Sequence, residues 1–349
     1  MTELRIPFDQ LRQFAQQCLV AAGGPAHDAV VTARFLTRTD AFGIHSHGLK
    51  NLAGYLDKAR RGGIDLTATP TVVAQSAAYT LLDAHAGLGM VSGVAAIETA
   101  IHKARETGIA LSVVRGATHF GAAGGYALIA AEAGMIGIAV SNVDPNMTVP
   151  GARGKVVGNN PLAYAFPAGD HRPVVFDIAL SAVASLKVVE AKRRGEPVPA
   201  GWIIDGTGRP TTDPSRYPDE GAMLPMAGHK GYGLAVLVDA LTGLLADAPT
   251  SDQVPSWLFS PDEPNDVTFT FIVIDPDRIG GPGYADRAAG YLDRLHASPL
   301  ADGATEILHP GQLEWRAWDR AMADGVPLPE GVRLALETAG RDTGVTLPW

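Results

Sequence analysis

Apolar residues in the first 60 positions of the chain recur at the spacing of helix faces. The pattern predicts one helix over residues 8–22, ended by Gly23 and Gly24, and a second over residues 26–40, ended by Gly43. A third helix follows, whose apolar face consists of Leu49, Leu52, Ala53 and Leu56. It is ended by Gly62 and Gly63. The N-terminal part of the chain is therefore predicted to be helical.

From about residue 66 the pattern changes to short β-rich runs that alternate with Ala-rich helical stretches. The runs predict strands over residues 79–83, 110–114, 136–140, 162–166, 174–178 and 269–274. The stretches between them predict helices over residues 87–106, 124–133, 182–194 and 232–245. Proline and glycine gather in residues 195–225 and 249–264, which predicts long surface connections. The pattern indicates a mixed α/β body, and it returns to amphipathic helix from residue 285.

Composition narrows the class of protein. The 349 residues include one cysteine, Cys18, so an internal disulfide is impossible and no Cys/His spacing suits a structural zinc. No signal-peptide pattern or uninterrupted membrane-spanning run is visible, which predicts a soluble cytoplasmic protein without a membrane partner. A net charge of -9 without long basic runs argues against nucleic acid as a partner. It leaves an anionic small ligand possible, because such a ligand responds to local charges.

The segment AFGIHSHGLKNL, residues 41–52, gathers chemistry-bearing residues at the start of the third helix. We expect Ser46 to cap this helix and His47 to lie in its first turn. There the helix dipole would favour a neutral imidazole, whose protonated form is a readier proton donor. The alternative is that Ser46 is only a cap and that the histidines are polar surface residues.

Two glycine-containing segments are candidate phosphate-binding loops. In RGATHFGAAGGYA, residues 115–127, glycines precede a predicted helix and His119 lies beside them, although a tight turn would explain the same pattern. In AGHKGYG, residues 227–233, His229 and Lys230 lie in a glycine loop before an apolar helix. The second segment is not a Walker loop, since no Ser or Thr follows the lysine. It combines a cation with backbone donors, as a phosphate cradle does.

A fourth segment, residues 158–187, carries polar residues at predicted strand and helix ends. These are Asn159, Asn160, Asp177, Ser181 and Lys187. A buried polar network would explain some of them without a functional role. A fifth segment, DAHAGLGMVSG, resembles a dinucleotide-binding turn, but three residues separate Gly89 from Gly93 where the Rossmann motif has two. A Rossmann fold is therefore not predicted.

Taken in order, these segments resemble the malate/L-lactate dehydrogenase type of NAD(P)-dependent oxidoreductases. The family includes ureidoglycolate dehydrogenase, sulfolactate dehydrogenase, 2,3-diketogulonate reductase and piperideine-2-carboxylate reductase. The matching motifs are SHG at 46–48, HFGAAG at 119–124, GNNP at 158–161, FD...S at 176–181, GW..D..G.PTTDP at 201–214, GHKGYG at 228–233 and HPG at 309–311.

The resemblance implies a fold and an assembly. It implies a mixed α/β, non-Rossmann protein with a largely antiparallel seven-stranded sheet domain and a helical domain built from both termini. The expected boundaries are residues 1–66 with 286–349 for the helical domain and 67–285 for the cofactor-binding domain, with a possible sub-domain near 124–195. It also implies a homodimer.

The resemblance further implies an activity: interconversion of a 2-keto acid and a 2-hydroxy acid with NAD or NADP, without a metal. His47 matches the proton donor and acceptor and Ser46 the group that orients it, although His119 matches the catalytic base of some relatives. Lys187 is expected to be a catalytic residue as well. The residues implied to contact the cofactor are His119, Phe120, Gly121, Asp177, Ile178, Ala179, Ser181, His229, Lys230, Pro310, Gly311 and Gln312.

The substrate side departs from the family. Asn51 stands where several relatives carry an arginine for the substrate carboxylate, and Asn159 replaces the threonine of GTNP. An amide grips a carboxylate less firmly than a guanidinium does, so we expect Asn51 and Asn159 to read a neutral or hydroxylated remainder of the substrate.

Two other classes of function stay open at this point. A metal-dependent hydrolase could use His45, His47, His119 and His229, although no known ligand spacing supports it. A non-catalytic nucleotide-binding protein would keep the GHKGYG loop and lack hydride transfer. The sequence leaves open the natural substrate, the preferred cofactor and the physiological direction.

Overall fold

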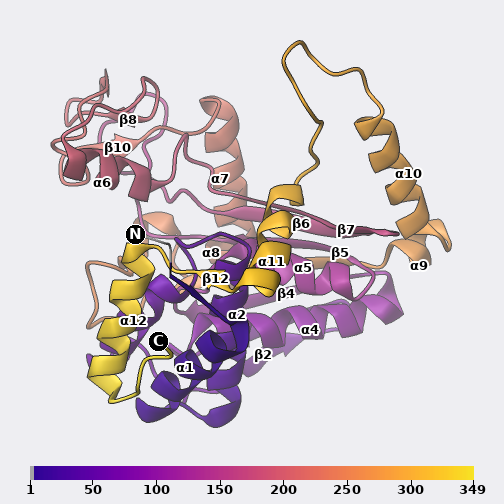
Figure 1. Ribbon diagram of the computed structural model, residues 1–349, viewed down its shortest axis with the longest axis horizontal. Coiled ribbons are helices and arrows are strands. Elements are labelled where there is room, and N and C mark those ends of the chain that lie inside the picture. Colours follow the sequence, from indigo (N-terminus) through magenta and orange to yellow (C-terminus); the bar gives the residue numbers. More distant parts are fainter. Residues whose placement is uncertain (1–3) are drawn as a thin grey trace.

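A seven-stranded sheet forms the centre of the computed structural model, which describes residues 4–349 (Figure 1). The strand order is β2-β3-β4-β11-β5-β6-β7, and every neighbouring pair is antiparallel except β3 and β4. The bounds are β2 (Thr71–Gln75), β3 (Tyr79–Asp83), β4 (Ile109–Ala117), β5 (Ile136–Ser141), β6 (Leu162–Ala168), β7 (His171–Ile178) and β11 (Val267–Ile274). The expected mixed α/β fold with a largely antiparallel sheet is thus confirmed.

All six strands predicted from the sequence are present, and β2 is the one strand of the seven-stranded sheet that the sequence did not predict. Its residues are mostly exposed, because β2 is an edge strand that pairs with β3 alone. An exposed edge strand lacks the alternation of buried and exposed residues that marks a strand in a sequence.

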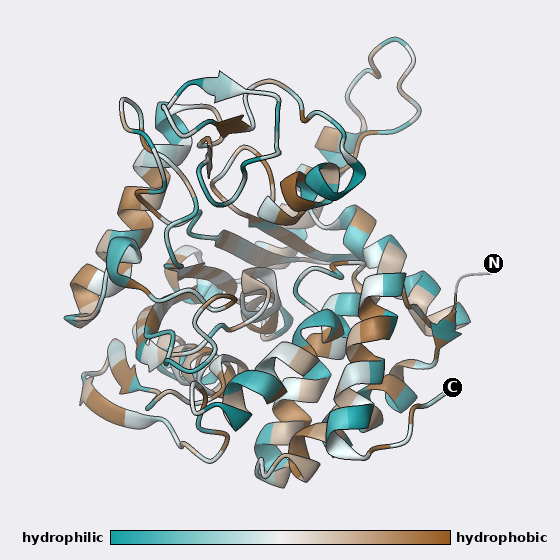
Figure 2. Cartoon of the chain, turned by 90° about the vertical axis from the view of Figure 1, so that its left-hand side faces the viewer, coloured by the Kyte–Doolittle hydropathy of each residue, from teal (hydrophilic) through white to brown (hydrophobic). Residues whose placement is uncertain are grey.

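Helices cover both faces of the sheet. The helices α4 (Gly89–Thr107) and α5 (Ala123–Glu132) pack on β4, β5 and β6, whereas α7 (His229–Leu241) contacts β5, and α8 (Gly243–Ala246) contacts β4 and β11. The central strand β11 is consequently buried along most of its length. Figure 2 shows hydrophobic residues concentrated in the central strands, while hydrophobic and hydrophilic residues alternate along the surrounding helices.

Helices from both ends of the chain pack together, most of them below the sheet in Figure 1. They are α1 (Phe8–Ala21), α2 (Ala26–Ala41), the 3-10 helix η1 (Leu49–Asn51), α3 (Leu52–Arg60), α11 (Gln312–Asp324) and α12 (Glu330–Thr343). Two short strands, β1 (Arg5–Ile6) and β12 (Val326–Pro327), pair antiparallel and join the two ends of the chain. The division into domains at residues 66 and 286 stays a prediction, and residues 1–3 of it lie outside the described range.

The α10 helix packs against the sheet. Its range is Tyr284–His296, and buried Ala288 and Leu292 lie against Val174 of β7. The short helix α9 (Pro276–Gly280) precedes it. Within residues 4–349, no helix is long and apolar enough to cross a membrane.

Residues 183–223 form a small unit with its own apolar core of Val183, Val188, Ala191, Val198, Ile203, Tyr217 and Met223. The unit contains α6 (Ser185–Arg194) and a sheet of β8 (Ile203–Ile204), β9 (Pro210–Thr211) and β10 (Ala222–Met223). The α6 helix begins three residues later than the sequence predicted, because the backbone of Ser181 and Ala182 pairs with residues 224–225 instead.

The predicted helix 232–245 is two helices in the structure. The α7 helix begins earlier, at His229, and ends at Leu241 before α8. The break lies at Thr242, and a side chain at Gly243 would collide with the backbone of Pro249. The 3-10 helix η2 (Ser251–Gln253) follows in the connection that leads to β11.

Candidate active site

The fold brings His47 and His119 together. His47 lies in the turn between α2 and η1, and His119 lies between β4 and α5. Their ring centroids are 5.7 Å apart with 30° between the planes. Two imidazoles from distant parts of the sequence therefore face the same space.

A buried carboxylate holds the SHG turn in place. Asp40, at the end of α2, is fully buried; its Oδ1 pairs with His45 Nδ1 at 2.7 Å, and its Oδ2 accepts from the N–H of Leu49 at 2.6 Å. A side chain at position 48 would collide with this carboxylate, so the turn requires Gly48. Burial raises the pKa of Asp40, and the bonds to His45 and Leu49 oppose this rise.

This geometry corrects the expected roles of the turn. Ser46 does not cap the helix. The helix begins at Leu49, and its first N–H group, that of Leu49, donates to Asp40. The Ser46 hydroxyl instead bonds His47 Nδ1 at 2.8 Å, and His47 precedes the helix rather than lying in its first turn. The expected neutral form of His47 is supported, but burial rather than a helix dipole lowers its pKa.

Tyr55 fixes the orientation of His119. Its hydroxyl lies 2.6 Å from His119 Nδ1, and the residue is fully buried on α3. Burial raises the pKa of Tyr55, so the phenol keeps its proton. His119 Nδ1 is its one hydrogen-bond partner among residues 4–349. A protonated phenol suits an imidazole that accepts at Nδ1 and carries its hydrogen on Nε2.

His119 is neutral over the whole physiological range. Burial, together with the neighbouring His47, lowers the pKa of His119 to about 3. Trp257 stacks on its ring with centroids 4.9 Å apart and 13° between the planes. Trp257 also contacts Tyr55, and a side chain at Gly54 would lie 3.1 Å from the indole. Packing and hydrogen bonding thus hold His119 in one position.

Sequence reasoning did not identify Tyr55 or Trp257. Tyr55 belongs to the apolar face of the third helix, where an aromatic residue is most often part of the core. Trp257 lies in the Pro-rich connection 249–264, which was interpreted as surface. No pattern within either segment indicated these residues, because their contacts with His119 come from a distant part of the sequence.

Asp177 at the end of β7 joins the start of α5. Its Oδ2 accepts from the N–H of Gly124 at 2.7 Å. Burial raises the pKa of Asp177 to about 6, against the effect of this bond, and Glu314 adds to the rise. Ile178 and Ala179 follow it, half-buried, and the Ser181 hydroxyl bonds the carbonyl of Val183.

The loop after His119 is partly a core element. The ring of Phe120 is buried and stacks on Tyr126 and Phe269. Gly121 has a φ of +79°, a value that residues with a side chain rarely adopt, and it lies close to Phe35. Phe120 thus anchors the loop in the core, and its contact with a cofactor stays a prediction.

His229 and Lys230 are the first two residues of α7, not part of a loop before it. Ala227 and Gly228 reach the helix with positive φ values of 47° and 63°. The side chains of His229 and Lys230 are exposed. A side chain at Gly231, by contrast, would approach Met226 O to 2.5 Å. A cation at a helix N-terminus is the arrangement that favours a phosphate group.

The HPG turn docks on the edge strand β7. The N–H of Val175 donates to Pro310 O at 3.4 Å, and Gly311 has φ +90° with Val175 so close that a side chain would not fit. Gln312 begins α11, and its Oε1 accepts from the N–H of His309 at 3.3 Å. The turn therefore lies beside the strand that carries Asp177.

Both proposed substrate residues have structural partners. Asn51 Nδ2 donates to Ser46 O at 3.0 Å. Asn159 pairs with Asn146, since its N–H donates to Asn146 Oδ1 at 2.9 Å and its Oδ1 accepts from Asn146 Nδ2 at 3.1 Å. Asn160 is buried in a network with Asp239 and Ser251, as the alternative interpretation of that segment expected.

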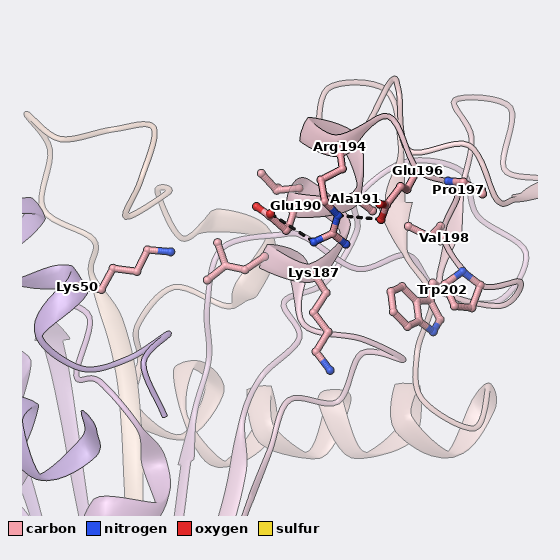
Figure 3. Close-up of a pocket in the computed structure, with 12 residues that line it drawn as sticks. Lys50, Lys187, Glu190, Ala191, Arg194, Glu196, Pro197, Val198 and Trp202 are labelled. Atoms are coloured by element: carbon pink, nitrogen blue, oxygen red, sulfur yellow. Dashed lines mark hydrogen bonds and ion pairs between the residues drawn. The ribbon is translucent and has the colours of Figure 1, made fainter. Parts of the chain in front are cut away.

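Lys187 lies on the exposed face of α6, in a cleft of about 540 Å³ that it shares with Lys50 of η1 (Figure 3). His47, Ser46 and His119 do not line this cleft. The catalytic role of Lys187 stays a prediction. Within residues 4–349, no group of three or more His, Cys, Asp or Glu side chains is arranged to hold a metal ion.

Comparison with known proteins supports the resemblance. The chain is 39% identical over 350 residues to a malate dehydrogenase of Pyrococcus abyssi, covering 98% of this chain and 96% of that protein. It is 34% identical over 327 residues to a (2R)-3-sulfolactate dehydrogenase (NADP(+)) of Chromohalobacter salexigens, covering 94% and 95%.

The fold is shared as well. The structure of sulfolactate dehydrogenase from Methanocaldococcus jannaschii superimposes with a TM-score of 0.91 at 32% identity, covering 99% of this chain and 98% of that one. A sequence model described as Malate/L-lactate dehydrogenase matches residues 6–337. The chain therefore belongs to the malate/L-lactate dehydrogenase family of oxidoreductases.

Proposed function

We propose that this protein interconverts a 2-keto acid and a 2-hydroxy acid with NAD or NADP, using the two imidazoles at the substrate oxygen. The observation that carries the proposal is the pair His47 and His119, 5.7 Å apart, each with its Nδ1 held by a separate hydroxyl. This leaves both Nε2 atoms without a partner among the described residues. Two such groups suit a carbonyl oxygen that gains negative charge and a proton during reduction.

The two histidines have different tasks in this proposal. Because its pKa is about 3, His119 stays neutral and offers the hydrogen on Nε2 as a fixed hydrogen-bond donor to the oxygen. Burial alone lowers the pKa of His47, whereas burial and the charge of His47 both lower the pKa of His119, so we assign the transfer of the proton to His47. Ser46 orients His47 through Nδ1.

Several residues suit a dinucleotide, and one of them, Asp177, bonds the loop that follows His119. Lys230 at the start of α7 suits a phosphate, and Asp177, Ile178, Ala179, Ser181 and the turn of Pro310, Gly311 and Gln312 lie along the end and edge of β7. The reduced nicotinamide, when bound, would supply the hydride. The cofactor named for the relative of C. salexigens is NADP.

A screen of 2-keto acids with NADH and with NADPH tests this function. The readout is the loss of absorbance of the reduced nicotinamide. Activity that persists in the presence of a chelator is expected, since no metal takes part. Hydrolysis without any change of nicotinamide absorbance would contradict the proposal, as would nucleotide binding without turnover on any 2-keto or 2-hydroxy acid.

We also propose that Asn51 and Asn159 read a neutral or hydroxylated remainder of the substrate. Asn51 uses one of its two amide N–H groups for Ser46 O and keeps its oxygen and its second N–H for the ligand. It can thus both accept from and donate to a hydroxyl, whereas an ionised carboxylate only accepts. Kinetics with oxaloacetate, pyruvate, a branched and a hydroxylated 2-keto acid test this. Oxaloacetate as the best substrate by kcat/KM, with an unchanged ranking in Asn51→Ala, would contradict it.

A homodimer is proposed on the surface of α7 and α8. Four large apolar side chains are exposed there: Val236, Leu237, Leu244 and Leu245. Contiguous exposed apolar residues are typical of protein interfaces. Light scattering coupled to size exclusion should give the mass of two chains, and Leu244→Glu with Leu245→Glu should give the mass of one.

A further inference from the structure

Lys58 is a buried lysine on α3, the helix that also carries Tyr55 about one turn earlier, and 1% of its surface is exposed. A lysine is rarely buried to this degree unless its ammonium group has partners. Its Nζ donates to Ser260 O at 2.6 Å and to Glu263 O. Burial lowers the pKa of Lys58, and the carboxylates of Asp262 and Glu263 oppose this effect. A buried cation on α3 therefore holds the backbone of the connection that leads to β11.

The segment that Lys58 holds is a turn over residues 256–263. Inside this turn, the N–H of Ser260 donates to the carbonyl four residues earlier at 3.1 Å. The turn also packs on the chain just after α3, where a side chain at Gly63 would approach Pro261 O to 2.5 Å. These contacts all reach backbone atoms of the turn. Its position relative to α3 is therefore set by the ammonium group of Lys58 and by the absence of a side chain at Gly63.

Trp257 is the residue that this turn brings to the two histidines. Its indole stacks on His119 with ring centroids 4.9 Å apart and 13° between the planes, and it lies 5.0 Å from the ring of Tyr55. The next two side chains, Leu258 and Phe259, are exposed and do not anchor it in a core. The position of the indole therefore depends on the backbone of the turn, which is tied to α3.

We propose that Lys58 is a positioning residue for the reaction: by tying the turn to α3, it keeps Trp257 on the face of His119 and keeps water away from that face. The role in the reaction rests on the proposed function, whereas the arrangement itself can be tested without turnover. From the elements packed against it, His119 faces the phenol of Tyr55 and the imidazole of His47, and the turn presents the uncharged indole. An imidazole covered in this way is desolvated, which disfavours its charged form.

Lys58→Met tests the proposal, because methionine keeps most of the length of the side chain and removes the donor. The titration of His119 is followed by NMR on full-length protein with 13C-labelled histidine, and His119→Asn identifies its signal. Burial and the neighbouring His47 lower the pKa of His119 to about 3, so the wild-type signal should not shift above about pH 5. In Lys58→Met water reaches the ring, and the signal should titrate between about pH 5 and pH 7.

Steady-state reduction of a 2-keto acid gives a second readout. We expect kcat of Lys58→Met to be about tenfold lower than that of the wild type and to fall further below about pH 7, where His119 takes up a proton, with an unchanged KM for the dinucleotide. Lys192→Met is the matched control, because Lys192 Nζ also donates to a backbone carbonyl, that of Tyr217 at 2.6 Å, within the small unit of residues 183–223. This control should keep the wild-type titration of His119 and the wild-type kcat.

Two more variants reach the same contact by other routes. Gly63→Ala pushes the turn away from α3 with Lys58 in place, so it should give the same titration of His119 even if Lys58→Met does not fold. The double variant Lys58→Met with Trp257→Ala should be no slower than Trp257→Ala alone, because Lys58 acts through the indole.

A His119 signal that stays fixed above about pH 5 in both Lys58→Met and Gly63→Ala overturns the proposal. A loss of kcat that is equal at every pH and shared by Lys192→Met overturns it too, since that is an effect of stability alone, and so do additive losses in the double variant. Titration of His119 in the variants of a protein that reduces no 2-keto acid upholds the placement of Trp257 by Lys58 and refutes the proposed function alone.

Discussion

Tyr55→Phe tests whether the phenol of Tyr55 sets the state of His119. The substitution removes the donor that lies 2.6 Å from His119 Nδ1 and keeps the ring that packs 5.0 Å from Trp257. His119 Nδ1 is then left without its donor in a buried place, which destabilises the fold by about 1–3 kcal/mol. A typical hydrogen bond contributes about 0.5–1.5 kcal/mol, so kcat should fall roughly 2- to 12-fold as the ring loses its fixed tautomer.

Tyr126→Phe is the matched control for this substitution. Tyr126 is also fully buried, and its hydroxyl donates to Phe120 O at 2.5 Å, but it does not bond an imidazole. Both variants should lose similar stability in urea unfolding, and only Tyr55→Phe should lose kcat in steady-state reduction of a 2-keto acid. The reasoning is refuted if the kcat of the two variants agrees within about twofold, since that would show an effect of stability alone.

Three further predictions follow from the site. His47→Ala should lower kcat about 10²- to 10⁴-fold with the Kd for the reduced dinucleotide unchanged; a larger loss in His119→Ala at saturating cofactor would exchange the two roles. Lys230→Ala should raise the apparent KM for the cofactor far more than it lowers kcat, and unchanged affinity in a titration would remove Lys230 from the phosphate site. Asp177 has a pKa raised to about 6 by burial, above its unfolded value of 3.8, so the folded state binds the extra proton and stability falls as pH rises from about 4 to 6. Thermal unfolding across that range should show this loss in the wild type relative to Asp177→Asn, and parallel curves for the two proteins would contradict it.

Much of the fold was predictable because its signals are local. Glycines ended the first helices where the sequence placed them, and buried alternating runs marked six of the seven strands of the main sheet. The edge strand β2 lacks that alternation, since little of it is buried. The start of α7 was misjudged because two positive φ values at Ala227 and Gly228 let the helix begin directly at His229.

The site was predictable in its members but not in its contacts. His47 and His119 could be named from their motifs, whereas Asp40, Tyr55 and Trp257 act through distances that only the fold creates. Asp40 in particular takes the place that Ser46 was expected to fill, because a buried carboxylate reaches Leu49 across the turn. A pattern within one segment does not contain a partner that comes from another segment.

The central claim is tested most directly by following the hydride itself. The protein would be mixed with a nicotinamide cofactor deuterated at C4 and with the best 2-keto acid from the screen, and the product analysed by mass spectrometry. Hydride transfer at this site predicts a 2-hydroxy acid that carries one deuterium on C2, formed by the wild type and strongly reduced in His47→Ala. A product without deuterium, or no product from any 2-keto acid with either cofactor, would contradict the account.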